Sequence, residues 1–359
     1  RRIGLYSWVI ILRVLTFTMS VVGTFLVRSG ILNSVHTFAN DPSRGLFILS
    51  FLALMVFSSI FIFFRYAPED NKNYKIFSKE SFILANNWFM IFFLAVVLIG
   101  TLYPVFLDTL TGQKISVGPP YYNFILAPFL IPLLFLMTSG PNHKWISSDI
   151  KGIFNITLFI SVIIFSIIFF VIEEISLLLF LILLFSIYLI IQTIFDFYET
   201  FKNKNINLSR IISHFGFGLL ILSISLNQIF SVEKSFNAKL GDEKIFQNYI
   251  IKFNNLETFS KNNFKSVKGQ FEVIDTKKTR SQFLSPEIRV YNQPETITYE
   301  ASINTRLFSD TYLTMSNISN SDIFNIKFQK KPFMNFIWFS VLLISLGGIF
   351  QFLRFRTKT

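Results

Sequence analysis

Long apolar runs separated by short polar segments occupy most of the 359-residue chain. A helix that crosses the hydrocarbon core of a membrane needs about 20 mostly apolar residues. Seven such runs precede a polar stretch and one follows it, at about 6–27, 45–64, 87–107, 122–138, 153–171, 175–195, 211–230 and 333–353. The pattern predicts an α-helical polytopic membrane protein with about eight transmembrane helices. Pro128 and Pro132 shorten the fourth run, which leaves a kinked or a re-entrant helix open there.

Residues 231–332 have a different pattern, because apolar and polar positions tend to alternate and no run is long enough to span a membrane. Alternation with Asn, Gly and Pro between segments is typical of strands. About five or six strands are expected, which suffices for a small barrel or sandwich. The chain is therefore expected to contain a helical membrane domain with about seven spans (1–230), an inserted small all-β domain (231–332), and a final transmembrane helix with a tail (333–359).

The distribution of Lys and Arg predicts the orientation of the spans. If the C-terminus is cytoplasmic, the cytoplasmic segments carry 14 of these cations and the short loops on the opposite side carry 3, namely Arg28, Arg44 and Lys114. The β-rich domain then lies outside the cytoplasm, in the periplasm of a bacterium whose inner membrane holds the spans. This bias explains much of the net charge of +12 without nucleic acid.

Composition agrees with this class of protein and limits its chemistry. Hydrophobic residues make up 52% of the chain and charged residues 15%, against about 25% charged in a typical soluble domain. The chain has no Cys and three His, so chemistry that needs imidazole depends on His36, His143 and His214. Because the sequence opens on Arg1 and not on Met, a fragment without its N-terminal part is expected, although processing would give the same start.

His214 lies about 6 Å beyond Arg210, which marks the cytoplasmic rim of the seventh predicted span. An ionisable group at that depth is a functional hypothesis by default. Gly216 and Gly218 remove side-chain bulk beyond it, so either a flat macrocycle or another helix could approach closely. The alternative is a His that hydrogen-bonds a neighbouring helix, with glycines that serve helix packing.

His36 lies in the external connection between the first two spans. Asp41 and Pro42 are typical of a helix start, so the second span is expected to begin there. A neutral imidazole just above the membrane is an available metal ligand, although an ordinary loop His has the same pattern. Arg28 and Arg44 flank this connection and oppose the charge bias. Either their side chains extend to the lipid headgroups, or their guanidinium groups bind carboxylates such as those of a porphyrin.

His143 falls in a predicted cytoplasmic loop and is expected to be a solvated loop side chain. The chain contains no P-loop, GxSxG, HExxH or strand-associated GxGxxG motif, so several common enzyme classes are not indicated.

Several motifs together resemble the CcmF family, the heme lyase subunit of bacterial cytochrome c maturation systems. They are, in order, 23–30 (GTFLVRSG), 34–39 (SVHTFA), 41–45 (DPSRG), 84–88 (LANNW), 100–104 (GTLYP) and 112–123 (GQKISVGPPYYN). A membrane His followed by Gly, an external β-rich domain and one last helix are also similar to the family. The resemblance covers essentially the whole chain.

The resemblance implies a heme lyase that accepts heme from a periplasmic heme chaperone (CcmE-like) and joins it to the CxxCH motif of apocytochrome c. His36 would be an axial ligand of the incoming heme. His214 would ligate a resident heme b, with Gly216 and Gly218 beside it. Other maturation subunits (CcmH/CcmI-like) and membrane lipid would be its partners. An enzyme without Cys fits, because the reacting thiols belong to the substrate.

Two heme sites with two His ligands each need four imidazoles, and this chain supplies one plausible ligand to each site. The family's tryptophan-rich motif and its first external and membrane His are expected in a missing N-terminal half, either lost by truncation or carried by a separate chain. Activity is expected only with that half and the partner subunits. The alternatives are a heme-transport or heme-sensing membrane protein without ligase activity, and a small-molecule transporter.

Overall fold

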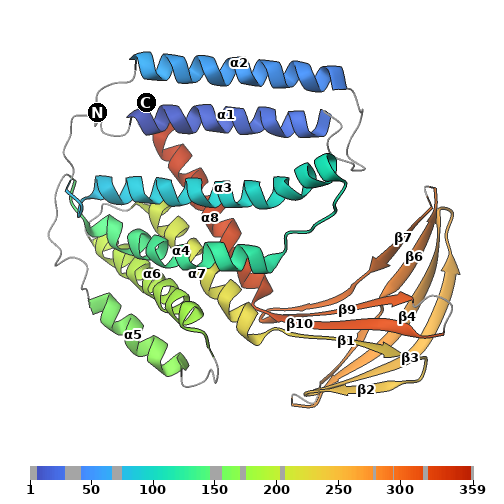
Figure 1. Ribbon diagram of the computed structural model, residues 1–359. Helices are drawn as coiled ribbons and strands as arrows, with labels where there is room; N and C mark the ends of the chain where they lie inside the picture. The colour runs from blue at the N-terminus through green and yellow to red at the C-terminus, as the bar shows by residue number, and fades with distance from the viewer. Residues whose placement is uncertain are drawn as a thin grey trace. The chain divides into compact units, whose positions relative to one another are not determined.

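The computed structural model describes residues 6–28, 42–66, 75–145, 156–169, 175–202, 207–277, 280–293, 295–317 and 322–356 (Figure 1). The chain divides into two compact units, residues 1–156 and 157–359. The first unit contains four long helices and one short 3-10 helix: α1 (Tyr6–Arg28), α2 (Pro42–Tyr66), α3 (Lys79–Thr111), α4 (Pro119–Ser139) and η1 (Gly140–Asn142).

Within the first unit, α1 packs against α2 and α3 packs against α4. Trp8 of α1 meets Trp88 of α3 edge to face, with ring centroids 5.3 Å apart. Gly100 allows α3 and α4 to approach closely, because a Cβ there would lie 2.8 Å from ring atoms of Tyr121 and Tyr122. Aromatic and small residues therefore make the contacts between these helices.

Local capping residues, more than the ends of the apolar runs, determine where helices of this unit begin and end. The Ser78 side chain caps α3 by accepting a hydrogen bond from the Ser81 N–H at 3.2 Å. Gly112, with φ of 70°, ends α3 in the left-handed conformation. The helix begins eight residues before the predicted apolar run, because that run was interrupted at its start by polar residues such as Lys79, Glu80 and Asn86. The fourth run is one continuous helix of 21 residues despite Pro128 and Pro132, and it is long enough to span a membrane.

The second unit contains the other helices: α5 (Ile156–Phe169), α6 (Leu177–Lys202), α7 (Leu208–Phe230) and α8 (Met334–Arg356). Helix α7 packs against both α6 and α8. Among the described residues, seven helices of the chain are long and apolar enough to cross a membrane. The fifth predicted run appears as the 14-residue α5, whose two ends adjoin residues outside the described ranges. The predicted polytopic helical class is thus confirmed, with seven spans of full length.

In the described ranges between α7 and α8 there are ten strands: β1 (Val232–Ala238), β2 (Glu243–Phe246), β3 (Tyr249–Ser260), β4 (Phe264–Asp275), β5 (Arg280–Leu284), β6 (Glu287–Asn292), β7 (Glu295–Glu300), β8 (Ser302–Arg306), β9 (Ser309–Asn317) and β10 (Phe324–Pro332). One sheet has the order β1-β10-β9-β8. The other has the order β2-β3-β4-β6-β7, with β5 also paired to β4. The expected count of five or six was wrong, because several strands have only four to six residues and little alternation.

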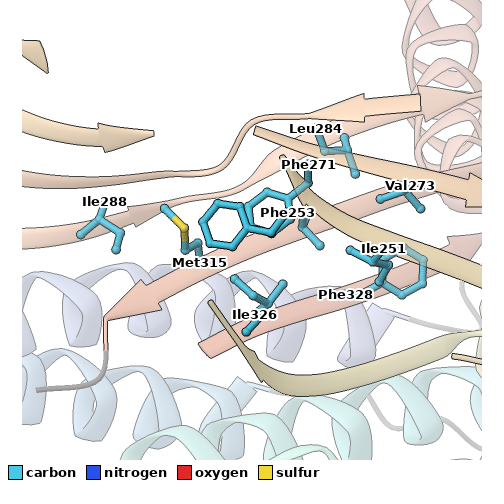
Figure 2. Packing of buried hydrophobic residues seen from close by; sticks show 11 residues of the cluster. Ile251, Phe253, Phe271, Val273, Leu284, Ile288, Met315, Ile326 and Phe328 are labelled. Atoms are coloured by element: carbon cyan, nitrogen blue, oxygen red, sulfur yellow. The ribbon is translucent and has the colours of Figure 1, made fainter. Parts of the chain in front are cut away.

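Apolar side chains from both sheets form one core (Figure 2). The rings of Phe253 and Phe271 stack with centroids 4.3 Å apart, and both side chains are about 1% exposed. Gly269 is needed beside them, because a Cβ there would lie 2.6 Å from a ring atom of Phe271 and 2.9 Å from Met315 Sδ. Two sheets with a shared interior make this domain a β-sandwich.

Candidate functional site

Arg28 and Arg44 line the same hollow at one end of the α1–α2 pair. Arg28 is the last residue of α1, and Arg44 lies in the first turn of α2. The hollow is open, has a volume of about 480 Å³, and is also lined by Thr24, Ser43, Phe47 and Ile48. Its volume falls within the ~300–1,000 Å³ range of small-molecule sites. Two guanidinium groups beside an apolar wall suit a flat apolar molecule that carries carboxylates.

The connection between Arg28 and Arg44 contains His36, at the midpoint of the sequence between them. His36 lies outside the described residues, so its predicted role as a heme ligand stays a prediction. Helix α2 begins at Pro42, as the Asp41–Pro42 pair predicted. The connection that carries His36 therefore runs from Arg28, the last residue of α1, to Pro42, the first residue of α2, and Arg44 follows two residues later.

His214 lies in the second turn of α7 and is half-buried. It follows Arg210 by four residues and precedes Gly218 by four, so the three positions share one face of the helix. That face meets α6, because a Cβ on Gly218 would lie 2.9 Å from Ile190 Cγ1 and 3.4 Å from the Ser186 carbonyl oxygen. His214 is therefore on the face of α7 that packs near α6.

Gly216 points to the other neighbour of α7. A Cβ at this position would lie 3.0 Å from Leu343 Cβ and 3.1 Å from the Ile344 backbone nitrogen of α8. Helices α7 and α8 are also close one to two turns away, where Ser209 Oγ donates a 2.8 Å hydrogen bond to the Gly347 carbonyl oxygen. Helix packing thus accounts for Gly216 and Gly218, and their contact with heme stays a prediction.

A chain of polar side chains crosses three helices next to His214. Thr157 of α5 donates a 2.6 Å hydrogen bond to Gln192 Oε1 of α6. Gln192 Nε2 donates to Asp196 Oδ1 at 3.1 Å, and Asp196 Oδ2 pairs with Arg210 Nη2 of α7 at 3.1 Å. Thr157 and Gln192 are buried, and the Asp196 side chain is only 12% exposed. The chain of hydrogen bonds fixes α5, α6 and α7 to one another one turn from the imidazole.

Sequence reasoning missed that Asp196 pairs with Arg210 and that Gln192 joins this pair through a hydrogen bond. Arg210 was interpreted only as a rim residue, whereas it forms an ion pair with a carboxylate 14 residues earlier. The order of the helices along the chain could have indicated this pair. Two antiparallel helices joined by a short connection bring the last turns of one beside the first turn of the next. An acidic residue in the last two turns of α6 was therefore a candidate partner for Arg210.

The expectation of a solvated His143 was wrong. The side chain is 4% exposed, and its ring meets the Phe82 ring edge to face with centroids 4.6 Å apart. Burial lowers the pKa of His143 below its usual range, because desolvation disfavours the charged imidazolium. Phe82, far earlier in the sequence, covers the His, and this contact is invisible to a local loop pattern.

Comparison with known proteins gives consistent results across the chain. Residues 229–332 match the family model described as the CcmF C-terminal beta-sandwich. The cytochrome c-type biogenesis protein CcmF of Pseudomonas aeruginosa is 30% identical over 98% of this chain and 56% of its own length. The CcmF of Escherichia coli is 28% identical over 97% of this chain and 55% of its own length.

The fold is also that of a solved structure. A protein described as cytochrome c heme lyase CcmF superposes with a TM-score of 0.70 at 16% identity, over 97% of this chain and 55% of that one. The chain thus spans about half the length of the relatives it matches. Because the sandwich model, the relatives and the fold agree, the chain belongs to the CcmF family of cytochrome c-type biogenesis proteins.

Proposed function

We propose that this chain is the C-terminal part of a heme lyase, which accepts heme from a periplasmic heme chaperone and promotes its attachment to the CxxCH motif of apocytochrome c. The observation that carries the proposal is the hollow lined by Arg28 and Arg44 at the two ends of the His36 connection. Its two cations and its apolar wall of Phe47 and Ile48 fit a porphyrin and its propionates.

In this proposal the two arginines bind the propionates of the incoming heme, and His36 is one axial ligand of its iron. Arg suits this role because its planar guanidinium forms two parallel hydrogen bonds to a carboxylate. Holding the heme by its propionate edge and its iron leaves the vinyl edge free for the substrate. The chain's own residues thus bind and orient, while the thiols come from apocytochrome c.

The reaction is the addition of two substrate thiols across the two heme vinyl groups. In each addition a sulfur–carbon bond forms at one vinyl carbon and the thiol hydrogen passes to the other, so nothing leaves. The absence of Cys from this chain is consistent with the assignment, because this part of the proposed lyase has no thiol that would itself capture a vinyl group.

We propose that His214 would hold a resident heme b, which would supply electron-transfer chemistry beside the substrate heme. Its half-buried position on a packed helix face suits a group that stays bound. Its imidazole would supply one nitrogen ligand to the heme iron. Two sites with two His each need four imidazoles, and we assign the other ligands to the part of the relatives that this chain does not span.

The orientation and partners of the chain complete the proposal. The bias of Lys and Arg supports a cytoplasmic C-terminus and a periplasmic β-sandwich in the bacterial inner membrane. The sandwich then lies on the side where apocytochrome c, the heme chaperone and the other maturation subunits are found. We propose that it docks one of these proteins.

Covalent heme attachment to a reporter cytochrome c, measured by heme staining in cells whose only heme lyase contains this chain, tests the proposal. The double variant Arg28→Ala/Arg44→Ala is expected to lower attachment at least tenfold, and the double Lys variant is expected to recover part of it. Arg65→Ala is the matched control, because Arg65 ends the same helix about 32 Å from Arg44.

Unchanged attachment in the Arg28→Ala/Arg44→Ala variant would contradict the proposed binding of the propionates. A heme transporter or sensor would give a different result: the wild-type chain would bind heme in these cells, and the reporter would receive no covalent heme.

A further inference from the structure

The turn between β8 and β9 exposes two large apolar side chains. Leu307 is 66% exposed and Phe308 is 61% exposed, and the preceding Arg306 is also exposed. Hairpin turns usually carry Gly, Asn, Asp, Ser or Pro, which solvate well. An Arg-Leu-Phe turn on a domain surrounded by water therefore needs an explanation.

Strand register places this turn at the end of the sandwich that adjoins α8. Ser309, the first residue of β9, pairs with Pro332, the last residue of β10. The Phe333 N–H donates a 2.8 Å hydrogen bond to the Phe308 carbonyl oxygen, and Asn335 Nδ2 donates to the Arg306 carbonyl oxygen at 2.8 Å. The Phe308 ring also stacks on Phe336, with centroids 5.6 Å apart. The turn thus lies beside the first turn of α8.

The joint between the sandwich and the helices is fixed at several points. Phe333 has φ of 61°, a left-handed conformation that bulky residues rarely adopt. On the other side, Asn227 Nδ2 of α7 donates a 2.6 Å hydrogen bond to the Pro332 carbonyl oxygen. Figure 1 shows β1, β9 and β10 meeting the ends of α7 and α8. These contacts fix the position of the β8–β9 turn beside the first turn of α8.

The turn between β8 and β9 lies at the level, measured along the α8 axis, at which α8 is expected to enter the membrane. The spanning segment of α8 begins at Met334, directly after the joint. Trp338, one turn further, is 64% exposed, as expected for a side chain at the lipid boundary. From this placement we infer that Leu307 and Phe308 insert into the lipid headgroup layer and anchor the sandwich to the membrane surface, with Arg306 directed to lipid phosphates.

Lipid accounts for all three side chains of the turn. Apolar side chains at a membrane surface enter the boundary between headgroups and acyl chains, and adjacent cations contact anionic lipid. Arg also buries its apolar stem while its guanidinium stays among the phosphates. The anchor holds the sandwich at a constant height over the end of α7, and it is independent of whether the chain handles heme.

Spin labels at single cysteines test the anchor, because the chain contains no Cys of its own. The full chain is reconstituted in nanodiscs of phosphatidylethanolamine and phosphatidylglycerol and labelled at Leu307→Cys. The control is Leu240→Cys, since Leu240 is 55% exposed in the turn that follows β1. That turn is at the far end of β1, whose six steps from Val232 to Ala238 span about 20 Å.

We measure the accessibility of each label to oxygen, which concentrates in lipid, and to a water-soluble nickel chelate. The oxygen-to-nickel ratio is expected to be several-fold higher for the Leu307→Cys label than for the Leu240→Cys label. Equal ratios would overturn the anchor and would favour a protein partner that covers the turn instead. Circular dichroism of both labelled proteins checks that the fold is retained.

Discussion

The two regions with candidate heme contacts differ in how tightly they are packed. In the described parts of α1 and α2, none of the spanning window is buried within the protein, whereas 44% of the α6 window and 39% of the α7 window are buried. Arg28 and Arg44 face an open hollow, while His214 lies on a packed helix face beside a buried chain of hydrogen bonds. An open site suits a molecule that arrives and leaves, and a packed site suits a group that stays.

The comparison predicts that the His214 region loses the most stability when a polar contact is removed. Asp196→Ala leaves Arg210 without its carboxylate and Gln192 without an acceptor. Removing one partner of a buried ion pair destabilises a protein by about 3–5 kcal/mol. Because the Arg210 side chain is 26% exposed, we expect a loss near the lower value, about 3 kcal/mol. Thermal unfolding in detergent, followed by circular dichroism, measures this loss.

The matched change in the open region is Arg28→Ala. Because its side chain is exposed, it is expected to change the free energy of unfolding by no more than about 0.5 kcal/mol. Equal losses from Asp196→Ala and Arg28→Ala would remove the distinction between a packed and an open region.

A smaller effect is expected from the contact between α7 and α8. A Cβ on Gly347 would clash with Ser213 Oγ and would lie 2.9 Å from the Ser209 carbonyl oxygen, so the helices must separate. Overpacking of this kind costs about 1–3 kcal/mol. Gly348 has no neighbour within 4 Å of an added Cβ among the described residues, so Gly348→Ala is a close control.

Gly347→Ala is therefore expected to lower the free energy of unfolding in the same assay, and Gly348→Ala is expected to leave it unchanged or raise it slightly. If both variants unfold like the wild type, α7 and α8 are not in the close contact that Gly347 and Ser213 indicate.

The spans were predictable because lipid imposes a length and an apolar composition on each of them. The start of α2 at Pro42 followed from local chemistry, since Pro suits the first helical position. The predicted number of strands was too low, because strands of four or five residues such as β2 and β8 give too little alternation to recognise and their place depends on paired neighbours.

Contacts between distant segments were the part that the sequence alone did not reveal. His143 was predicted to be solvated because its own loop is polar, but it is buried and its ring contacts Phe82, 61 residues earlier. The role of Gly216 stayed ambiguous between heme and helix, and its neighbour Leu343 lies more than 100 residues later. The pair Asp196–Arg210 depends on how two helices pack, so each residue alone resembled an ordinary helix-end charge.

The most direct test of the account is the heme spectrum of the proposed heme lyase that contains this chain, with His214→Ala and His36→Ala compared. His214→Ala is expected to abolish the absorbance of the proposed resident b-type heme. His36→Ala is expected to retain that absorbance and to lose the trapping of chaperone-delivered heme. The reverse pattern, with the resident heme lost in His36→Ala and kept in His214→Ala, would contradict the assignment of a packed site for the resident heme and an open site for the arriving one.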